Sequence, residues 1–218
     1  MSTEAQALRE RVSYQAMLLG GFSFIATLLL VLGNLATSDA IGERMREDLR
    51  ASLSQVIPAQ VHDNDLLEAP LQIEGPDGTP LTVYRGMRGA QVSALAWEIV
   101  GQGYAGDIRL ILGVDAAGEV LGVRVLSHAE TPGLGDKIEA NRSNWILEFA
   151  GLSLKNTPLA QWFVNKDGGR FDAFSGATIT PRAVVGAIRE GLQFFAEHRT
   201  AMLSTPVINA PVLEESQE

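Results

Sequence analysis

The chain has 218 residues, of which 46% are hydrophobic and 20% charged, so wholesale disorder is excluded and one buried domain with appendages is expected. Its formal net charge of −9, from 17 basic and 26 acidic side chains, excludes nucleic acid as the expected partner, because no basic stripe is present to neutralise phosphates. The absence of cysteine excludes disulfides, thiolate metal sites and iron–sulfur ligation within this chain.

A segment without charged side chains occupies residues 14–37 and predicts a single transmembrane helix, because ~20 such residues cross the hydrocarbon core. A cleaved signal peptide is the competing interpretation, since Arg9 and Arg11 supply a basic region ahead of the segment. However, the apolar run is longer than the usual signal core of ~7–15 residues, and residues 33–37 form a poor cleavage site. We therefore expect an uncleaved anchor, preceded by a cytoplasmic tail at 1–13.

The orientation of this anchor does not follow from charge alone. Arg9 and Arg11 precede the segment, while Arg44, Arg46 and Arg50 follow it at a similar distance, so the positive-inside rule does not decide. The shortness of the N-terminal tail and the lack of cysteine favour export of the larger C-terminal part. We expect a single-pass protein of the bacterial inner membrane whose C-terminal domain is periplasmic.

An amphipathic helix is predicted after the anchor, and together with a connecting segment it fills residues 38–70. Apolar side chains recur at helical spacing among charged ones, and Pro58 ends the pattern. The apolar positions are Ile41, Met45, Leu49, Leu53 and Val56.

A single domain is predicted over residues 71–200, and its first half contains strand patterns. Runs rich in β-branched and aromatic residues cover 81–84 and 92–100, and a turn joins the run at 108–114 to that at 120–126. These strands are expected to pair in an antiparallel sheet.

The second half of this domain contains helical patterns. One helix is predicted over 137–149, and a last helix begins with Thr180 as its N-cap and Pro181 at its first position. Strands with helices packed against them indicate an α+β fold. Residues 201–218 are predicted to form a polar tail.

Small and hydroxyl side chains lie just ahead of the last helix, at Ser175, Gly176, Ala177 and Thr178. Free backbone N–H groups and the helix dipole favour an anion at such a position, so a phosphate could bind there. A simpler interpretation is that Thr180 caps the helix and the other residues only shape the loop. The residues by themselves leave both interpretations open.

The run Ser-Gly-Ala-Thr at 175–178, preceded by Asp172, resembles the flavinylation motif of the FMN-binding subunits of Rnf electron-transport complexes and of the related sodium-pumping NADH:quinone reductase. In those subunits a separate flavin transferase, with FAD as donor, esterifies the last threonine of the motif to the phosphate of FMN. The resemblance implies a covalent FMN on Thr178, with Ser175, Gly176 and Ala177 in the cofactor site.

A second run, His-Ala-Glu-Thr-Pro-Gly-Leu-Gly at 128–135, is similar to the loop that flanks the flavin in the same subunits. Its proline and two glycines make a fixed turn without bulky side chains, so that the backbone can approach a flat ring. Glu130 and Thr131 then offer polar groups to the pyrimidine edge of the ring. The cofactor-binding residues implied for this loop are Glu130, Thr131, Gly133, Leu134 and Gly135.

The resemblance spans about residues 100–192, and the single short anchor is more similar to the G subunit of Rnf ion-translocating oxidoreductase complexes than to the C subunit of the reductase. It implies an electron-carrier component of a translocase that moves electrons between ferredoxin and NAD and transports ions. The implied partners are the other membrane subunits and the flavin transferase, and no independent active site or catalytic residue is expected. The alternative is a membrane-anchored extracytoplasmic module that binds an anion or ligand, or acts as a sensor, without redox activity.

The remaining candidates are expected to be structural. His62, His128 and His198 are far apart in the sequence, so no metal site is predicted. The three tryptophans of the chain are expected to be core aromatics.

Overall fold

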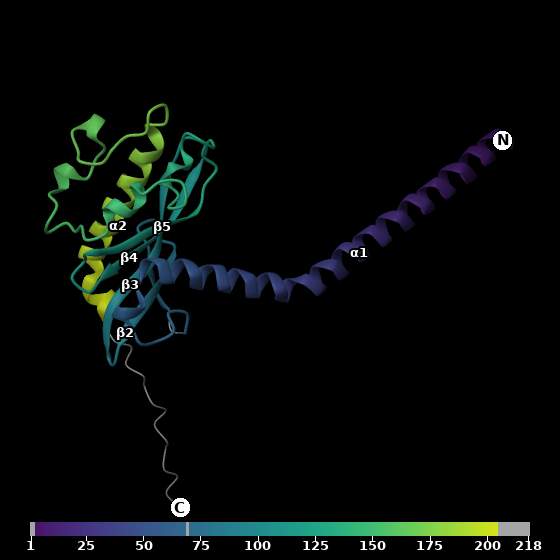
Figure 1. Cartoon of the computed structure of the whole chain (residues 1–218). Coiled ribbons are helices and arrows are strands. Elements are labelled where there is room, and N and C mark those ends of the chain that lie inside the picture. The colour runs from purple at the N-terminus through teal and green to yellow at the C-terminus, as the bar shows by residue number, and fades with distance from the viewer. Residues whose placement is uncertain (1–2, 69, 205–218) are drawn as a thin grey trace, which may run out of the picture. The chain divides into compact units, whose positions relative to one another are not determined.

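A computed structural model of the chain describes residues 3–68 and 70–204 and divides it into two compact units, residues 1–49 and 50–218 (Figure 1). Residues 1–2 of the predicted N-terminal tail and 205–218 of the predicted C-terminal tail lie outside the described residues. Helix α1 (Thr3–Val56) begins in the first unit and ends in the second.

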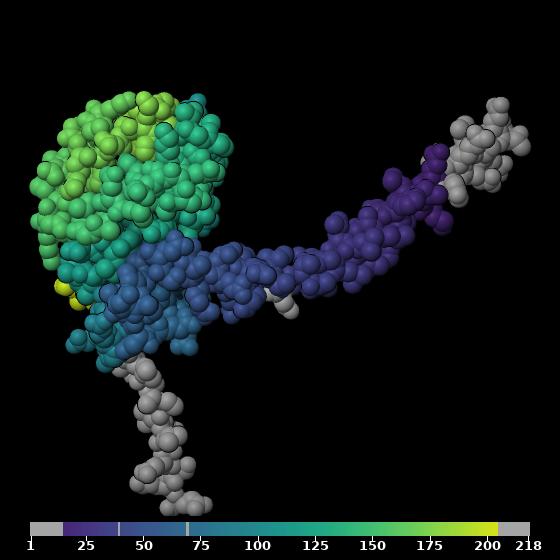
Figure 2. Space-filling model, viewed as in Figure 1, coloured from purple at the N-terminus to yellow at the C-terminus, as the bar shows by residue number. Residues whose placement is uncertain are grey.

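The first unit contains most of α1, a helix of 54 residues in all. Its stretch Gln15–Ser38 has a mean hydropathy of 2.2, and its side chains are exposed (Figure 2). This stretch is long and apolar enough to span a membrane, and it contains nearly the whole predicted anchor. The predicted amphipathic helix continues α1 without a break and ends at Val56, two residues before Pro58.

The second unit is built on five antiparallel strands in the order β1-β2-β3-β4-β5, which confirms the predicted antiparallel sheet. Each predicted strand lies inside an observed one. The strands are β1 (Leu71–Glu74), β2 (Pro80–Arg88), β3 (Gln91–Gln102), β4 (Asp107–Asp115) and β5 (Val120–Ser127). Helix α2 (Ile179–Leu203) follows the sheet in the chain, so the predicted α+β fold is confirmed.

Helix α2 covers one face of the sheet. Gly101 allows the contact, because a Cβ there would lie 2.6 Å from the carbonyl oxygen of Ala183 on the helix. Farther along, the Phe195 ring of α2 stacks on Trp97 of β3, with centroids 6.2 Å apart. The sheet and α2 therefore share one apolar core.

The end of α1 covers the opposite face of the sheet. Leu53, Val56 and Ile57 are fully buried. Gly113 of β4 makes room for them, because a Cβ there would lie 2.4 Å from the carbonyl oxygen of Val56. The last turn of α1 is thus part of the core of the second unit.

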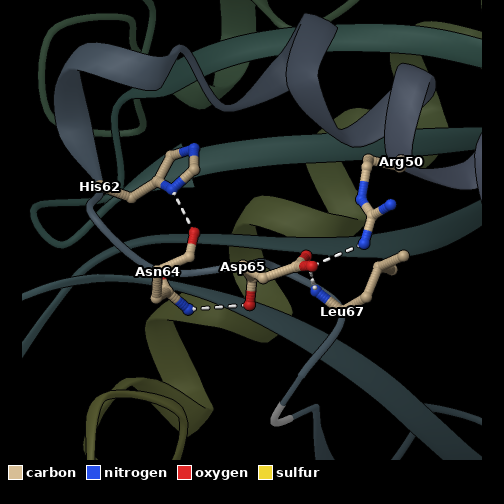
Figure 3. A network of polar contacts seen from close by, with 5 residues as sticks. All are labelled: Arg50, His62, Asn64, Asp65 and Leu67. Atoms are coloured by element: carbon tan, nitrogen blue, oxygen red, sulfur yellow. Dashed lines mark hydrogen bonds and ion pairs between the residues drawn. The ribbon is translucent and has the colours of Figure 1, made fainter.

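A polar network ties this end of α1 to the segment that follows it (Figure 3). Arg50 Nη2 donates to Asp65 Oδ2 over 2.5 Å, and the backbone N–H of Leu67 donates to Asp65 Oδ1 over 3.1 Å. The Leu67 N–H, and after it Arg50, lower the pKa of Asp65. In the same segment the Asn64 side chain donates to the carbonyl of Arg85 in β2, which anchors the segment on the sheet.

The helix predicted over 137–149 is wrong. Two short 3₁₀-helices stand there, η2 (Asp136–Ile138) and η3 (Trp145–Phe149). The intervening residues include asparagine and serine, whose side chains compete for backbone hydrogen bonds; Ser143 Oγ accepts from the N–H of Trp145 over 3.1 Å. Three further 3₁₀-helices are η1 (Ala59–Val61), η4 (Leu159–Gln161) and η5 (Asn165–Asp167).

The predicted N-cap of the last helix is also wrong. Thr178 occupies the N-cap position of α2, and Thr180 lies inside the first turn, fully buried. The physical reason is a long-range partner, since the Thr180 hydroxyl donates to the carboxylate of Glu130. Pro181 still falls in the first turn, where a helix leaves backbone N–H groups without partners.

Candidate functional site

An aromatic cluster supports the loop that leads into α2. Trp145 packs against Phe174 with ring centroids 5.0 Å apart, and its indole Nε1 donates to the carbonyl of Asp172 over 3.0 Å. Phe149 stacks on Phe171 at 4.5 Å. The prediction that the tryptophans are core residues is confirmed, since Trp97, Trp145 and Trp162 are at most 5% exposed. The loop therefore packs on buried aromatic side chains and is fixed to them by a hydrogen bond.

The loop itself turns at Ser175 and Gly176. The N–H of Ala177 donates to the carbonyl of Phe174 over 3.2 Å, and Gly176 has a φ of 83°, as the third residue of a type II turn requires. Phe174 is buried below, whereas Ser175 and Gly176 are exposed. The turn thus exposes Ser175 and Gly176 to solvent, and Thr178 follows one residue after the turn's closing residue, Ala177.

Thr178 has a half-buried side chain at the N-terminal end of α2. Its side chain makes no capping hydrogen bond to the first turn of α2. A helix N-terminus carries a partial positive charge that favours anions. The hydroxyl is therefore held at an electropositive position without being committed to the fold.

The second predicted loop also forms a tight turn. The N–H groups of Leu134 and Gly135 donate to the carbonyl of Thr131 over 3.1 and 3.0 Å, and Gly133 has a φ of 79°. The Gly133 N–H donates to Asp136 Oδ1 over 2.8 Å, which braces the turn from behind. Thr131, Gly133 and Leu134 are exposed, so this turn offers backbone and side chain to a ligand.

The structure brings the two loops together. A Cβ on Gly176 would lie 3.5 Å from Leu134 Cδ2, and a Cβ on Gly135 would lie 3.1 Å from Thr180 Oγ1. The exposed apolar side chains of Leu134 and Ile179 flank this meeting point, each 43% exposed. Residues separated by some forty positions in the sequence thus form one surface around the start of α2.

Glu130 connects three segments at this surface. Its side chain is buried, at 5% exposure; Oε1 accepts from the N–H of Ala105 over 2.9 Å, and Oε2 accepts from Thr180. A Cβ on Gly103 would lie 2.5 Å from Oε1, so the hairpin between β3 and β4 needs glycine here. Sequence reasoning missed these contacts of Glu130, because no local pattern reports a partner fifty residues away.

A salt bridge secures the other side of the start of α2. Arg182 donates to both carboxylate oxygens of Asp167 over 2.6 and 2.7 Å. These hydrogen bonds lower the pKa of Asp167 and raise that of Arg182. The guanidinium of Arg182 is therefore already paired with a carboxylate. Within residues 3–68 and 70–204, no group of three or more histidine, aspartate or glutamate side chains is arranged to hold a metal ion.

Residues 103–193, which include both loops, match the family model of the FMN-binding domain, and this match defines the class of protein. The chain is 50% identical over 188 residues to the G subunit of the ion-translocating oxidoreductase complex of Cereibacter sphaeroides (strain ATCC 17029), a match that covers 86% of each chain. The corresponding protein of Stutzerimonas stutzeri is 49% identical over 193 residues, or 88% of this chain and 85% of that one. The chain belongs to the family of G subunits of the ion-translocating oxidoreductase complex, as its motifs predicted.

Two solved structures are less similar to this chain. NqrC of Shewanella oneidensis matches with a TM-score of 0.47 and 22% identity, over 67% of this chain and 73% of that one. The C subunit of the Na⁺-translocating NADH-quinone reductase of Parabacteroides distasonis has a TM-score of 0.42 at the same identity, over 56% and 63%.

Proposed function

We propose that this chain is an electron-carrier subunit whose FMN is joined by a phosphoester to the hydroxyl of Thr178. The observation that carries the proposal is the state of that hydroxyl, which is half-buried at a helix N-terminus, follows an exposed small-residue turn and is not used as a cap. The FMN-binding domain model spans this residue, and the adjoining turn at 131–135 lies within it.

The residues around Thr178 fit a flavin mononucleotide. The phosphate would lie at the positive end of α2, beside the small residues Ser175, Gly176 and Ala177. Leu134 and Ile179 provide an apolar rim for a flat ring, and the turn at 131–135 presents Thr131 and Gly133, while Gly135 is buried beneath it. Glu130 contributes by holding that turn, and its carboxylate oxygens retain lone pairs for a further contact.

Attachment uses chemistry that the chain cannot supply alone, so a flavin transferase is the expected maturation partner. The Thr178 oxygen bonds to the phosphorus of the FMN moiety of FAD, the pyrophosphate bond breaks, AMP leaves and the hydroxyl proton is lost. Bound FMN accepts and returns electrons one or two at a time, while the protein tunes it through hydrogen bonds and charge. No independent active site is needed.

In the assembled complex we expect this chain to exchange electrons with the other membrane subunits, within a translocase that couples ferredoxin:NAD electron transfer to ion transport. Gln15–Ser38 would anchor it in the inner membrane, with the second unit on the periplasmic side. A covalent link suits that compartment, because free FMN is scarce there and a dissociated cofactor would be lost.

Coexpression with the flavin transferase tests the proposal. The full chain should give a fluorescent flavoprotein band on a denaturing gel, and Thr178→Val should give a dark one. Ser175→Ala is the matched control, since Ser175 is an exposed hydroxyl three residues away, and its band should stay bright. The intact mass should rise by one FMN less one water. An unmodified wild-type chain would refute the carrier function and leave an anion-binding or sensor module; a bright Thr178→Val band would refute the attachment site.

A further inference from the structure

His128 is engaged through both ring nitrogens. Its Nδ1 lies 3.0 Å from the backbone nitrogen of Glu130, and its Nε2 lies 2.7 Å from Oε1 of Glu139. The side chain of His128 is 10% exposed and that of Glu139 is 33% exposed. Two partners on opposite edges of a nearly buried ring fix both its position and its orientation.

The two contacts determine which nitrogen carries the proton. A backbone N–H group can only donate, so Nδ1 must present its lone pair to Glu130. The ring proton of neutral His128 therefore lies on Nε2 and is donated to the carboxylate of Glu139. This single tautomer satisfies both neighbours at once.

The backbone that His128 holds is the entry to the turn at 131–135. Glu130 follows two residues after His128, and its carboxylate joins the turn to Ala105 and to Thr180 of α2. A Cβ on Gly135 would lie 2.8 Å from Cβ of Glu130, so the far end of the turn rests on the same residue. A shift of the Glu130 backbone would displace the turn and its contacts with α2 together.

We propose that His128 is a positioning residue of the flavin site. As the Nε2–H tautomer, oriented by Glu139, it fixes the backbone of Glu130 and thereby the turn at 131–135 beside the loop that carries Thr178. What this turn contacts rests on the proposed function, whereas the hydrogen-bond chain from Glu139 to Glu130 does not.

The surroundings of the pair allow clean substitutions. His128 and Glu139 line a cavity of about 490 Å³ together with Arg124 and Asn141, so a shorter side chain at either position leaves a space already open to water. His128→Phe keeps the ring and removes both nitrogens. His128→Asn keeps an acceptor for the N–H two residues later, the geometry of an Asx turn, and gives up Glu139.

The experiment uses the full chain in detergent, coexpressed with the flavin transferase. Loss of the hydrogen bond from the Glu130 N–H should speed amide exchange in residues 128–136 of His128→Phe about tenfold and slow flavin attachment to Thr178 by a similar factor. His128→Asn should stay near the wild type in both measurements, which is the rescue that a merely space-filling histidine would not show. His198→Phe is the control, because His198 is an exposed residue of α2 whose Nδ1 lies 3.0 Å from the carbonyl of Phe194.

Nitrogen-15 NMR of histidine-labelled protein reads the tautomer directly. A protonated Nε2 and an unprotonated Nδ1 at His128 support the inference, whereas the opposite tautomer overturns it. It is also overturned if His128→Asn exchanges and flavinylates as poorly as His128→Phe, or if His128→Phe matches the wild type. If the wild-type chain takes up no flavin, the proposed function fails, while the tautomer and the amide exchange still decide the role of His128 in holding the turn.

Discussion

Thr178 and Thr180 are two residues apart, and the structure predicts opposite consequences for the loss of each hydroxyl. Thr180 is fully buried and donates to the carboxylate of Glu130, so Thr180→Val removes a hydrogen bond to a charged group while keeping the shape of the side chain. Such bonds contribute about 1.5–3 kcal/mol to the free energy of unfolding. Thr178→Val removes a hydroxyl without a described partner, so the free energy of unfolding should change by less than about 0.5 kcal/mol.

Urea unfolding of the full chain in detergent, followed by fluorescence, separates the two variants, because all three tryptophans lie in the second unit. Thr180→Val should lower the unfolding midpoint and still accept flavin, whereas Thr178→Val should keep the midpoint and lose the flavin. A double-mutant cycle with Glu130→Gln isolates the pair, and a coupling energy of about 1 kcal/mol or more is expected. An unchanged midpoint for Thr180→Val, or a coupling energy near zero, would refute the role given to this contact.

Gly113→Ala should destabilise the second unit by about 1–3 kcal/mol in the same urea assay, because the new Cβ would meet the backbone of Val56. Gly186→Ala is the control and should be neutral or slightly stabilising, because its Cβ would have no neighbour within 4 Å. Equal effects of the two substitutions would contradict the packing of Gly113 against Val56. Arg182 lowers the pKa of Asp167 in the folded protein below its ordinary value of 3.8, so the pair stabilises the fold above pH 3.8, and this stabilisation is lost as the pH falls through the folded pKa. In a carboxyl NMR titration, Arg182→Gln should return the pKa of Asp167 toward 3.8, and an unchanged titration would argue against the pair. A periplasm-dependent phosphatase fused to the C-terminal end should be active, and activity of a cytoplasm-dependent reporter instead would reverse the predicted orientation.

The sheet was predictable where local patterns were strong. Residues 108–126 form two long apolar strands around a glycine-containing turn, and this hairpin is found as β4 and β5. Strand β1 was missed because it has only four residues and a single neighbour, β2, so little in its own composition marks it. The helix predicted over 137–149 failed because side chains such as that of Ser143 accept backbone N–H groups that a continuous helix would need.

The resemblance predicted that both motifs lie at one flavin, but it did not predict which of their residues touch. The contacts of Gly135 with Thr180 and of Gly176 with Leu134 depend on how the sheet and α2 pack, which no local pattern reports. The same limit explains the misplaced cap, because Thr180 has a suitable side chain and a proline after it, yet a buried carboxylate fifty residues earlier takes its hydroxyl.

The burial of Leu53, Val56 and Ile57 has a practical consequence for producing a water-soluble form of the protein. A truncation that begins at residue 71, where the predicted domain starts, would discard these side chains and expose to solvent the face of the sheet at Gly113 and Gly122 that the end of α1 covers. Such a fragment should aggregate or demand detergent even though it lacks the anchor. A cut just before Arg50 removes the hydrophobic span and retains both these side chains and the ion pair with Asp65, so that fragment is expected to stay in solution without detergent.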